Sequence, residues 1–361
     1  MFAVFAATLF AGNEKSTGAI VRLLNSRAAG SPRAYEEAAK IVREDADKGG
    51  LLQKFIIAVI SRDDDPPEAA RLSERDRERF LEDSRDKIRK LAEGNNNALA
   101  WYVLSMENND MSMLETAASY GNVQALNAFG TIRLTTAMKD ASLSTNAMDR
   151  IQKRVYKCFK WASDQGDANG FYNLGMCHVN GYGCPRDERL AFECFRAAAE
   201  KGHPEAINNI GGFFRDGIVV RRNPELSVAW FKKSCELGNE FGMLNYALAL
   251  LSGEGVDVNH KGAVKLLRFL AERRANAEGM NVYGVCLSRG LGVKRDDRAA
   301  FSWFEKSAAK GFAMAMDNLS GCYERGLGVE RDSMKSLLWK MRARASSGDR
   351  AAAEWLEAND K

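Results

Sequence analysis

Apolar residues in the second half of the chain recur at helical spacing, inside units that repeat about every 36 residues. In one unit Ala206, Ile210 and Phe213 fall on one face of a predicted first helix, helix A. In the preceding unit Ala191 and Phe195 fall on one face of a predicted second helix, helix B. A fixed period of this size is typical of a solenoid, whose units cannot bury their apolar faces alone. The pattern therefore predicts an all-α fold, an α/α solenoid of helix pairs.

Polar and glycine positions between the helices repeat with the same period. Gly-x-Gly loops such as Gly290–Gly292 are expected to end helix A, because glycine adopts the left-handed backbone that closes a helix. An Asp or Asn then stands where helix B needs an N-cap. These predicted caps are Asp187, Asn223, Asn259, Asp296 and Asp332. Helix B is expected to close at Gly202, Gly238 and Gly311.

The first half of the chain shows the same design with unequal lengths. A closing glycine of helix B is predicted at Gly166, Gly121, Gly94 and Gly49. The predicted organisation is divergent helical pairs or a cap over residues 1–93, degenerate repeats over 94–166, five regular repeats over 167–347 and a C-terminal capping helix over 348–361.

The charge balance and the histidine content reduce the number of functions to be considered. The 52 basic and 48 acidic residues leave a formal charge of +4, and no long Lys/Arg run occurs, so neither nucleic acid nor a membrane surface is expected as a partner. The chain has only three histidines, and none stands at a recognised catalytic spacing from a Cys or Ser. We therefore expect no catalysis, no cofactor, no metal and no small-molecule substrate.

The seven cysteines and the apolar start bear on the compartment. Cys177, Cys286 and Cys322 share one repeat position, as small apolar fillers between helices would, which indicates reduced, buried thiols and a cytoplasmic protein. No apolar stretch is long enough to span a bilayer. The segment Met1–Ala11 is apolar but lacks the basic residues of a signal peptide. If it does belong to one, the protein is secreted or periplasmic.

The order of these motifs resembles a known family. Asn173-Leu-Gly, then Gly290-Leu-Gly-Val293, then Asp296 and Ala300, then Trp303 with a following Lys-x-Ala-Ala, is similar to the Sel1-like repeat, a relative of the tetratricopeptide repeat. The resemblance is specific from about residue 167 to 347. It implies a right-handed superhelix that acts as an adaptor between proteins.

This chain departs from the pattern of one branch of that family. In the secreted, cysteine-rich branch, paired cysteines staple helix A to helix B. Cys235 matches one member of such a pair, but Ile207 occupies the position of its partner. The resemblance therefore implies no disulfide staple, and it argues against the β-lactam binding ascribed to that branch.

The candidate binding site is a row of asparagines on helix A. By analogy with tetratricopeptide repeats this position faces a concave groove, where a carboxamide can both donate to and accept from a peptide backbone. The alternative is that each Asn bonds a neighbouring repeat and shapes the solenoid. The row is Asn173, Asn209, Asn245 and Asn318. The same analogy adds Tyr172, Asn208, Arg215, Leu244, Leu248, Asn281, Asp317 and Glu324.

The sequence thus favours a protein–protein interaction scaffold that binds a partner peptide or helix in this groove. The alternative is a regulatory or immunity-type inhibitor that wraps and occludes a partner enzyme.

Overall fold

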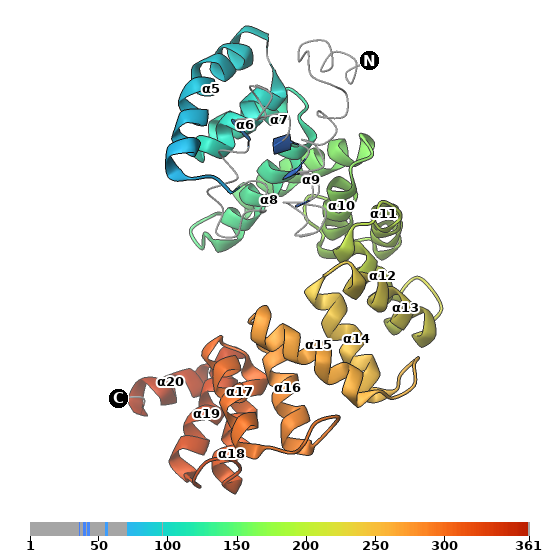
Figure 1. Cartoon of the computed structure of the whole chain (residues 1–361), viewed down its shortest axis with the longest axis vertical. Helices are drawn as coiled ribbons and strands as arrows, with labels where there is room; N and C mark the ends of the chain where they lie inside the picture. The colour runs from blue at the N-terminus through green and yellow to red at the C-terminus, as the bar shows by residue number, and fades with distance from the viewer. Residues whose placement is uncertain are drawn as a thin grey trace. The chain divides into compact units, whose positions relative to one another are not determined.

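The structure, a computed structural model, describes residues 71–95 and 97–359, with isolated positions between 36 and 56. Within those ranges every regular element is an α-helix and no strand occurs (Figure 1). The chain divides into two compact units, Met1–Ile210 and Gly211–Lys361. The prediction of an all-α solenoid is confirmed.

The first unit contains the irregular helices and the first regular pair. Its helices in the described ranges are α5 (Glu74–Asn95), α6 (Ala98–Asn108), α7 (Met111–Ser119), α8 (Val123–Lys139), α9 (Thr145–Asp164), α10 (Ala168–Asn180) and α11 (Glu188–Glu200), followed by the start of α12 (Pro204–Asp216). From α5 to α11 each helix packs against the next along the chain. In addition α8 contacts α10, so that helices A of consecutive repeats are neighbours.

The second unit continues the helix pairs to the C-terminal helix (Figure 1). Its further helices are α13 (Pro224–Glu236), α14 (Glu240–Ser252), α15 (His260–Arg273), α16 (Ala277–Arg289), α17 (Asp297–Ala309), α18 (Ala313–Arg325), α19 (Ser333–Ser346) and α20 (Arg350–Asn359). Consecutive helices pack together, and α16 also contacts α18. One apolar core runs from α14 to α18.

The predicted caps are confirmed. The side chains of all five predicted N-cap residues accept a hydrogen bond from a backbone N–H of the first turn of helix B. Gly202, Gly238 and Gly311 have φ angles of +84°, +86° and +84°, the left-handed backbone expected after helix B. Local sequence chemistry therefore sets where these helices begin and end.

The second glycine of the Gly-x-Gly loop has a role that the sequence did not reveal. At Gly255, where φ is +72°, a Cβ would lie 2.3 Å from the carbonyl oxygen of Pro224, at the start of the preceding helix B. The backbones of neighbouring repeats therefore meet at Gly255 and leave no room there for a Cβ. Val219 stands at the equivalent position of another loop with φ +65°, which is strained for a β-branched residue.

Helices A and B of one repeat approach each other through a glycine on a phenylalanine. A Cβ at Gly284 would lie 2.6 Å from Cε1 of Phe304. Gly175 meets Phe195 and Gly211 meets Phe231 in the same way. The Leu-Gly phrase of the sequence is therefore a packing contact, because the missing side chain admits the aromatic ring.

Two tryptophans of helix B and the cysteines are also packing residues. Trp303 and Trp339 are half-buried against the core, and the Lys306 ammonium lies 4.1 Å from the centroid of the Trp303 ring. All seven cysteines are free thiols, and the three that share a repeat position are buried. Burial raises the pKa of Cys286 to about 11, which keeps this thiol protonated near neutral pH.

One predicted helix end is wrong. Gly94 does not close a helix in the left-handed conformation but lies inside the last turn of α5, which ends at Asn95. No neighbouring atom lies within 4 Å of a Cβ built there, so this glycine is not required by packing. Gly121 and Gly166 do have positive φ angles, as predicted. Gly49 and the Met1–Ala11 segment lie outside the described residues, and the predicted domain boundaries stay predictions.

Candidate functional site

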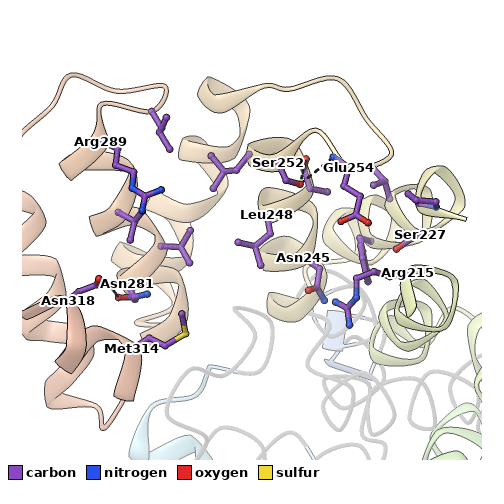
Figure 2. A pocket seen from close by; sticks show the side chains of 18 residues that line it. Arg215, Ser227, Asn245, Leu248, Ser252, Glu254, Asn281, Arg289, Met314 and Asn318 are labelled. Atoms are coloured by element: carbon purple, nitrogen blue, oxygen red, sulfur yellow. Dashed lines mark hydrogen bonds between the residues drawn. The ribbon is translucent and has the colours of Figure 1, made fainter. Parts of the chain in front are cut away.

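A groove of about 650 Å³ lies on the second unit and is lined mainly by its helices A (Figure 2). Side chains of α14, α16 and α18 form most of its surface, and α12, α13 and the loops after α14 and α16 contribute the rest. We call this cavity the unit-2 groove.

The centre of the unit-2 groove is apolar. Leu248 on α14 is 37% exposed although it is aliphatic. Val282 and Val285 on α16 lie on one helix face because they are three residues apart, and both line the cavity. Met314 at the start of α18 is 62% exposed, and its flexible thioether can adapt to more than one partner shape.

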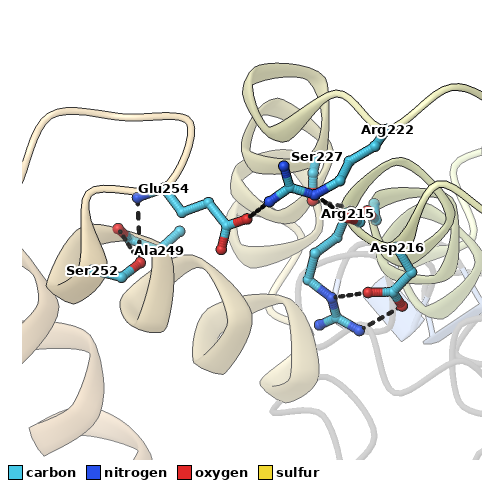
Figure 3. A network of polar contacts seen from close by, with 8 residues as sticks. Arg215, Asp216, Arg222, Ser227, Ala249, Ser252 and Glu254 are labelled. Atoms are coloured by element: carbon cyan, nitrogen blue, oxygen red, sulfur yellow. Dashed lines mark hydrogen bonds and ion pairs between the residues drawn. The ribbon is translucent and has the colours of Figure 1, made fainter.

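One end of the unit-2 groove carries a network of ion pairs (Figure 3). Arg222 pairs with Glu254, which joins the loops of two consecutive repeats, and its Nε also donates to the carbonyl oxygen of Arg215 at 3.1 Å. Arg215 binds Asp216 through two bonds of 2.8 and 3.0 Å. The hydrogen bonds from Arg215 lower the pKa of Asp216, so this carboxylate is ionised near neutral pH. Each of these two ion pairs has no net charge.

The opposite end carries a cation without such a partner. Figure 2 shows Arg289 and Glu254 on opposite sides of Leu248. Arg289 is the last residue of α16 and is exposed, and it forms no ion pair with any residue that the structure describes. Of the described residues that line the unit-2 groove, only Arg215, Glu254 and Arg289 are charged. The lining together with its ion-pair partners therefore has one excess positive charge.

Two members of the predicted asparagine row bond a neighbouring repeat. Asn318 Nδ2 donates to Asn281 Oδ1 at 2.7 Å, and Asn173 Nδ2 donates to Asn127 Oδ1 at 3.2 Å. In both cases the donor stands two residues before the Gly, or Ser320, of its own helix A. The acceptor stands three residues before the Gly of the preceding helix A. These bonds are those expected from the alternative in which the row shapes the solenoid. Asn209 lies half-buried with its Nδ2 4.0 Å from Met176 Sδ.

The other predicted binding residues are distributed as follows. Five of the twelve line the unit-2 groove, namely Arg215, Asn245, Leu248, Asn281 and Asn318. Asp317 and Glu324 are exposed on α18 but lie outside the lining. Tyr172 and Asn208 are half-buried in the first unit, where the Tyr172 ring stacks on His203 with centroids 4.5 Å apart. Whether these residues bind a partner stays a prediction.

Leu244 is a correction to the predicted groove face. It is 5% exposed and belongs to the core of the second unit. Asn281 holds the same repeat position and is 3% exposed, although it also borders the cavity. This position lies where consecutive helices A touch, because Asn281 accepts its bond from the next helix A. The tetratricopeptide analogy assigned this position to the open surface of the groove, whereas it lies between consecutive helices A.

The structure also adds groove residues that the sequence interpretation missed. Val285 holds the repeat position of Leu248, and Val282 holds that of Asn245, so the register of the other repeats was enough to find both. Met314 carries no comparable signal, because the equivalent positions of other repeats hold unrelated residues. The position of Arg289 holds Asn180, Asp216, Ser252 and Arg325 in the other repeats, so its positive charge recurs only once.

A thiol and an imidazole that the sequence did not pair lie close together in the first unit. Cys184 Sγ is 3.6 Å from His178 Nδ1, and His178 is buried with the Tyr156 ring edge-on against it. Burial raises the pKa of Cys184, which is the opposite of what an activated nucleophile needs. This contact is therefore explained by packing of the loop after α10.

Two further observations concern other kinds of site. Among the described residues no cluster of His, Cys, Asp or Glu has the arrangement that would hold a metal ion. Within the same part of the chain, no helix combines the length and the apolar character needed to cross a membrane.

Comparison with known proteins gives one family and a shared fold. The Sel1 repeat family matches residues 172–203, 204–239, 241–273, 277–312 and 313–339. The crystal structure of a Sel1 repeat protein from Oxalobacter formigenes is 26% identical, with a TM-score of 0.59, over 68% of this chain and 96% of that one. The c5321 protective antigen of uropathogenic Escherichia coli, which displays the same repeat fold, is 24% identical with a TM-score of 0.58. That match covers 89% of this chain and 66% of the antigen chain. No curated protein is detectably similar in sequence.

Proposed function

Because this chain is a Sel1 repeat protein, with five repeats between residues 172 and 339, we propose that it is an adaptor that binds a partner peptide or helix in the unit-2 groove. Sel1 repeat proteins generally mediate protein–protein interactions. The proposal adds the place of binding and the form of the bound segment.

The observation that carries the proposal is the exposed apolar centre of the unit-2 groove. Leu248 and Met314 expose apolar surface inside a concavity, and both are bordered by Asn, Ser and Arg side chains. An apolar centre with a polar rim is the usual anatomy of a protein-binding patch. Exposed apolar surface in a concavity loses contact with water when a partner covers it, which favours association.

The proposal assigns no catalytic step to the chain. In the described ranges the close thiol–imidazole pair is Cys184 with His178, and burial raises the pKa of the Cys184 thiol. None of the residues that line the unit-2 groove is a His or a Cys. General acid–base or nucleophilic chemistry at the groove would need groups that titrate near neutral pH. The polar groups of the lining are carboxamides, hydroxyls, guanidinium groups and the carboxylate of Glu254, which is paired with Arg222. Such groups can form hydrogen bonds and ion pairs with a partner.

The test compares two identical substitutions in a native pull-down with mass spectrometry. Met314→Arg places a charge inside the unit-2 groove, and Met334→Arg places the same charge on α19 outside it. The two methionines are 62% and 68% exposed, so neither change should disturb folding, which circular dichroism checks. We expect one prey to be lost with Met314→Arg and retained with Met334→Arg. Retention of every prey by both variants would contradict binding in the groove.

The identity of that prey also separates the two candidate functions. A prey that is an enzyme and is stoichiometrically inhibited would make the chain an inhibitor of the immunity type. A prey that keeps its activity and joins a larger complex would make it an adaptor.

A further inference from the structure

The charges around the unit-2 groove indicate the chemistry of its partner. Three charged side chains line the cavity, and two of them are already paired within the protein. Glu254 is held by Arg222, and Arg215 is held by Asp216. Arg289 has no ion-pair partner among the described residues, so only at this end does the groove present an unbalanced charge.

The position of this cation relative to the apolar surface is fixed by one helix. Val282, Val285 and Arg289 follow one another on α16 at intervals of three and four residues, and all three line the unit-2 groove. Residues at such intervals share a helix face, and four residues advance about 6 Å along the axis. A segment lying along α16 therefore meets apolar surface first and a guanidinium group about 6 Å further on.

Resting on the proposed groove binding, we infer that the partner is an acidic, apolar-faced protein segment whose carboxylate pairs with Arg289. Its apolar side chain covers Val282, Val285 and Leu248. The carboxylate follows two residues later in an extended segment, at about 3.3 Å per residue, or four residues later in a helix. A guanidinium group suits this role because it binds a carboxylate through two parallel hydrogen bonds.

Other arrangements of charge are disfavoured by the same contacts. A basic partner would be repelled by Arg289. Glu254 would not offset this repulsion, because it lies on the other side of Leu248 and is paired with Arg222 (Figure 2). A neutral apolar partner would cover the centre but would leave the guanidinium group of Arg289 without a countercharge. Selection for a carboxylate at one end follows from this asymmetry.

The experiment uses the full chain and an array of synthetic peptides. Each peptide carries one Leu in a neutral background, with Asp, Asn or Lys placed two or four residues after it. Binding is measured for wild type, for Arg289→Glu and for the control Arg325→Glu. Arg325 is a matched control because it holds the same repeat position as Arg289, at the end of α18, and is exposed outside the groove lining.

We expect wild type to bind the Asp peptides about fivefold more tightly than the Asn peptides, the upper range for an ion pair at a rim. Arg289→Glu should invert the order so that the Lys peptides bind best, and Arg325→Glu should behave as wild type. This preference should weaken at high salt, because a rim ion pair is screened.

The remaining outcomes overturn the inference and tell it apart from the proposed function. If Leu-containing peptides bind but Asp, Asn and Lys are equivalent in every variant, the groove binds apolar segments and the acidic preference is wrong. If no peptide binds wild type above a Leu→Ser background, groove binding of a segment fails together with its charge preference.

Discussion

At the residue scale, the N-cap of α12 differs in its chemistry from the N-caps of the next two helices A. Asn239 and Asn276 cap the following helices A through bonds of 2.8 Å to backbone N–H groups. At the same repeat position His203 uses its ring, and Nδ1 accepts from the Ala206 N–H at 3.4 Å. Burial lowers the pKa of His203 to about 4, because a charged ring would lose its hydration, and this effect outweighs the Glu205 carboxylate 3.2 Å from Nδ1.

This cap should make stability depend on pH. Between pH 6.5, the ordinary value for His, and pH 4 the unfolded chain binds a proton at His203 that the folded chain does not. Folding stability should therefore be complete above pH 6.5 and fall by about 3 kcal/mol as the pH decreases to 4. Replacing His203 by Asn, the residue used in other repeats, should remove this part of the dependence. Urea unfolding of both proteins at several pH values measures it, and equal slopes would contradict the role of His203.

At the element scale, helices A contain glycines that have opposite surroundings. Gly284 lies in α16 with the Phe304 ring against it, whereas Gly212 lies in α12 with no atom within 4 Å of a built Cβ. Both are helical, so replacement by Ala brings the same gain in helix propensity, up to about 1 kcal/mol. Only the packing differs between them.

The two alanine substitutions should therefore have opposite signs. Gly284→Ala should destabilise the protein by about 1–3 kcal/mol, because the new Cβ overlaps the phenylalanine ring. Gly212→Ala should leave stability unchanged or raise it by about 0.5–1 kcal/mol. Thermal and urea unfolding measure both. A stabilising Gly284→Ala would show that the ring moves aside without cost, so that the glycine is not what sets the distance between the helices.

At the scale of the whole molecule, the sequence predicts the repeated helices and their ends better than the contacts between repeats. The N-caps at Asp187 and Asp296 are correct because a cap bonds only its own first turn. The approach of Gly255 to Pro224 and the ion pair of Arg222 with Glu254 join residues about 30 positions apart, and no local rule indicates them. The position shared by Leu244 and Asn281 is buried for the same reason, since the next helix A covers it.

The central claim is that the unit-2 groove holds a segment of another protein. Its most direct test is photo-crosslinking in cells that express the chain, with a benzophenone amino acid in place of Leu248 and, separately, of Met334. We expect one discrete crosslinked product from position 248 that disappears when Met314→Arg is added, and no such product from position 334. Products that form equally from both positions, or from neither, would contradict the claim.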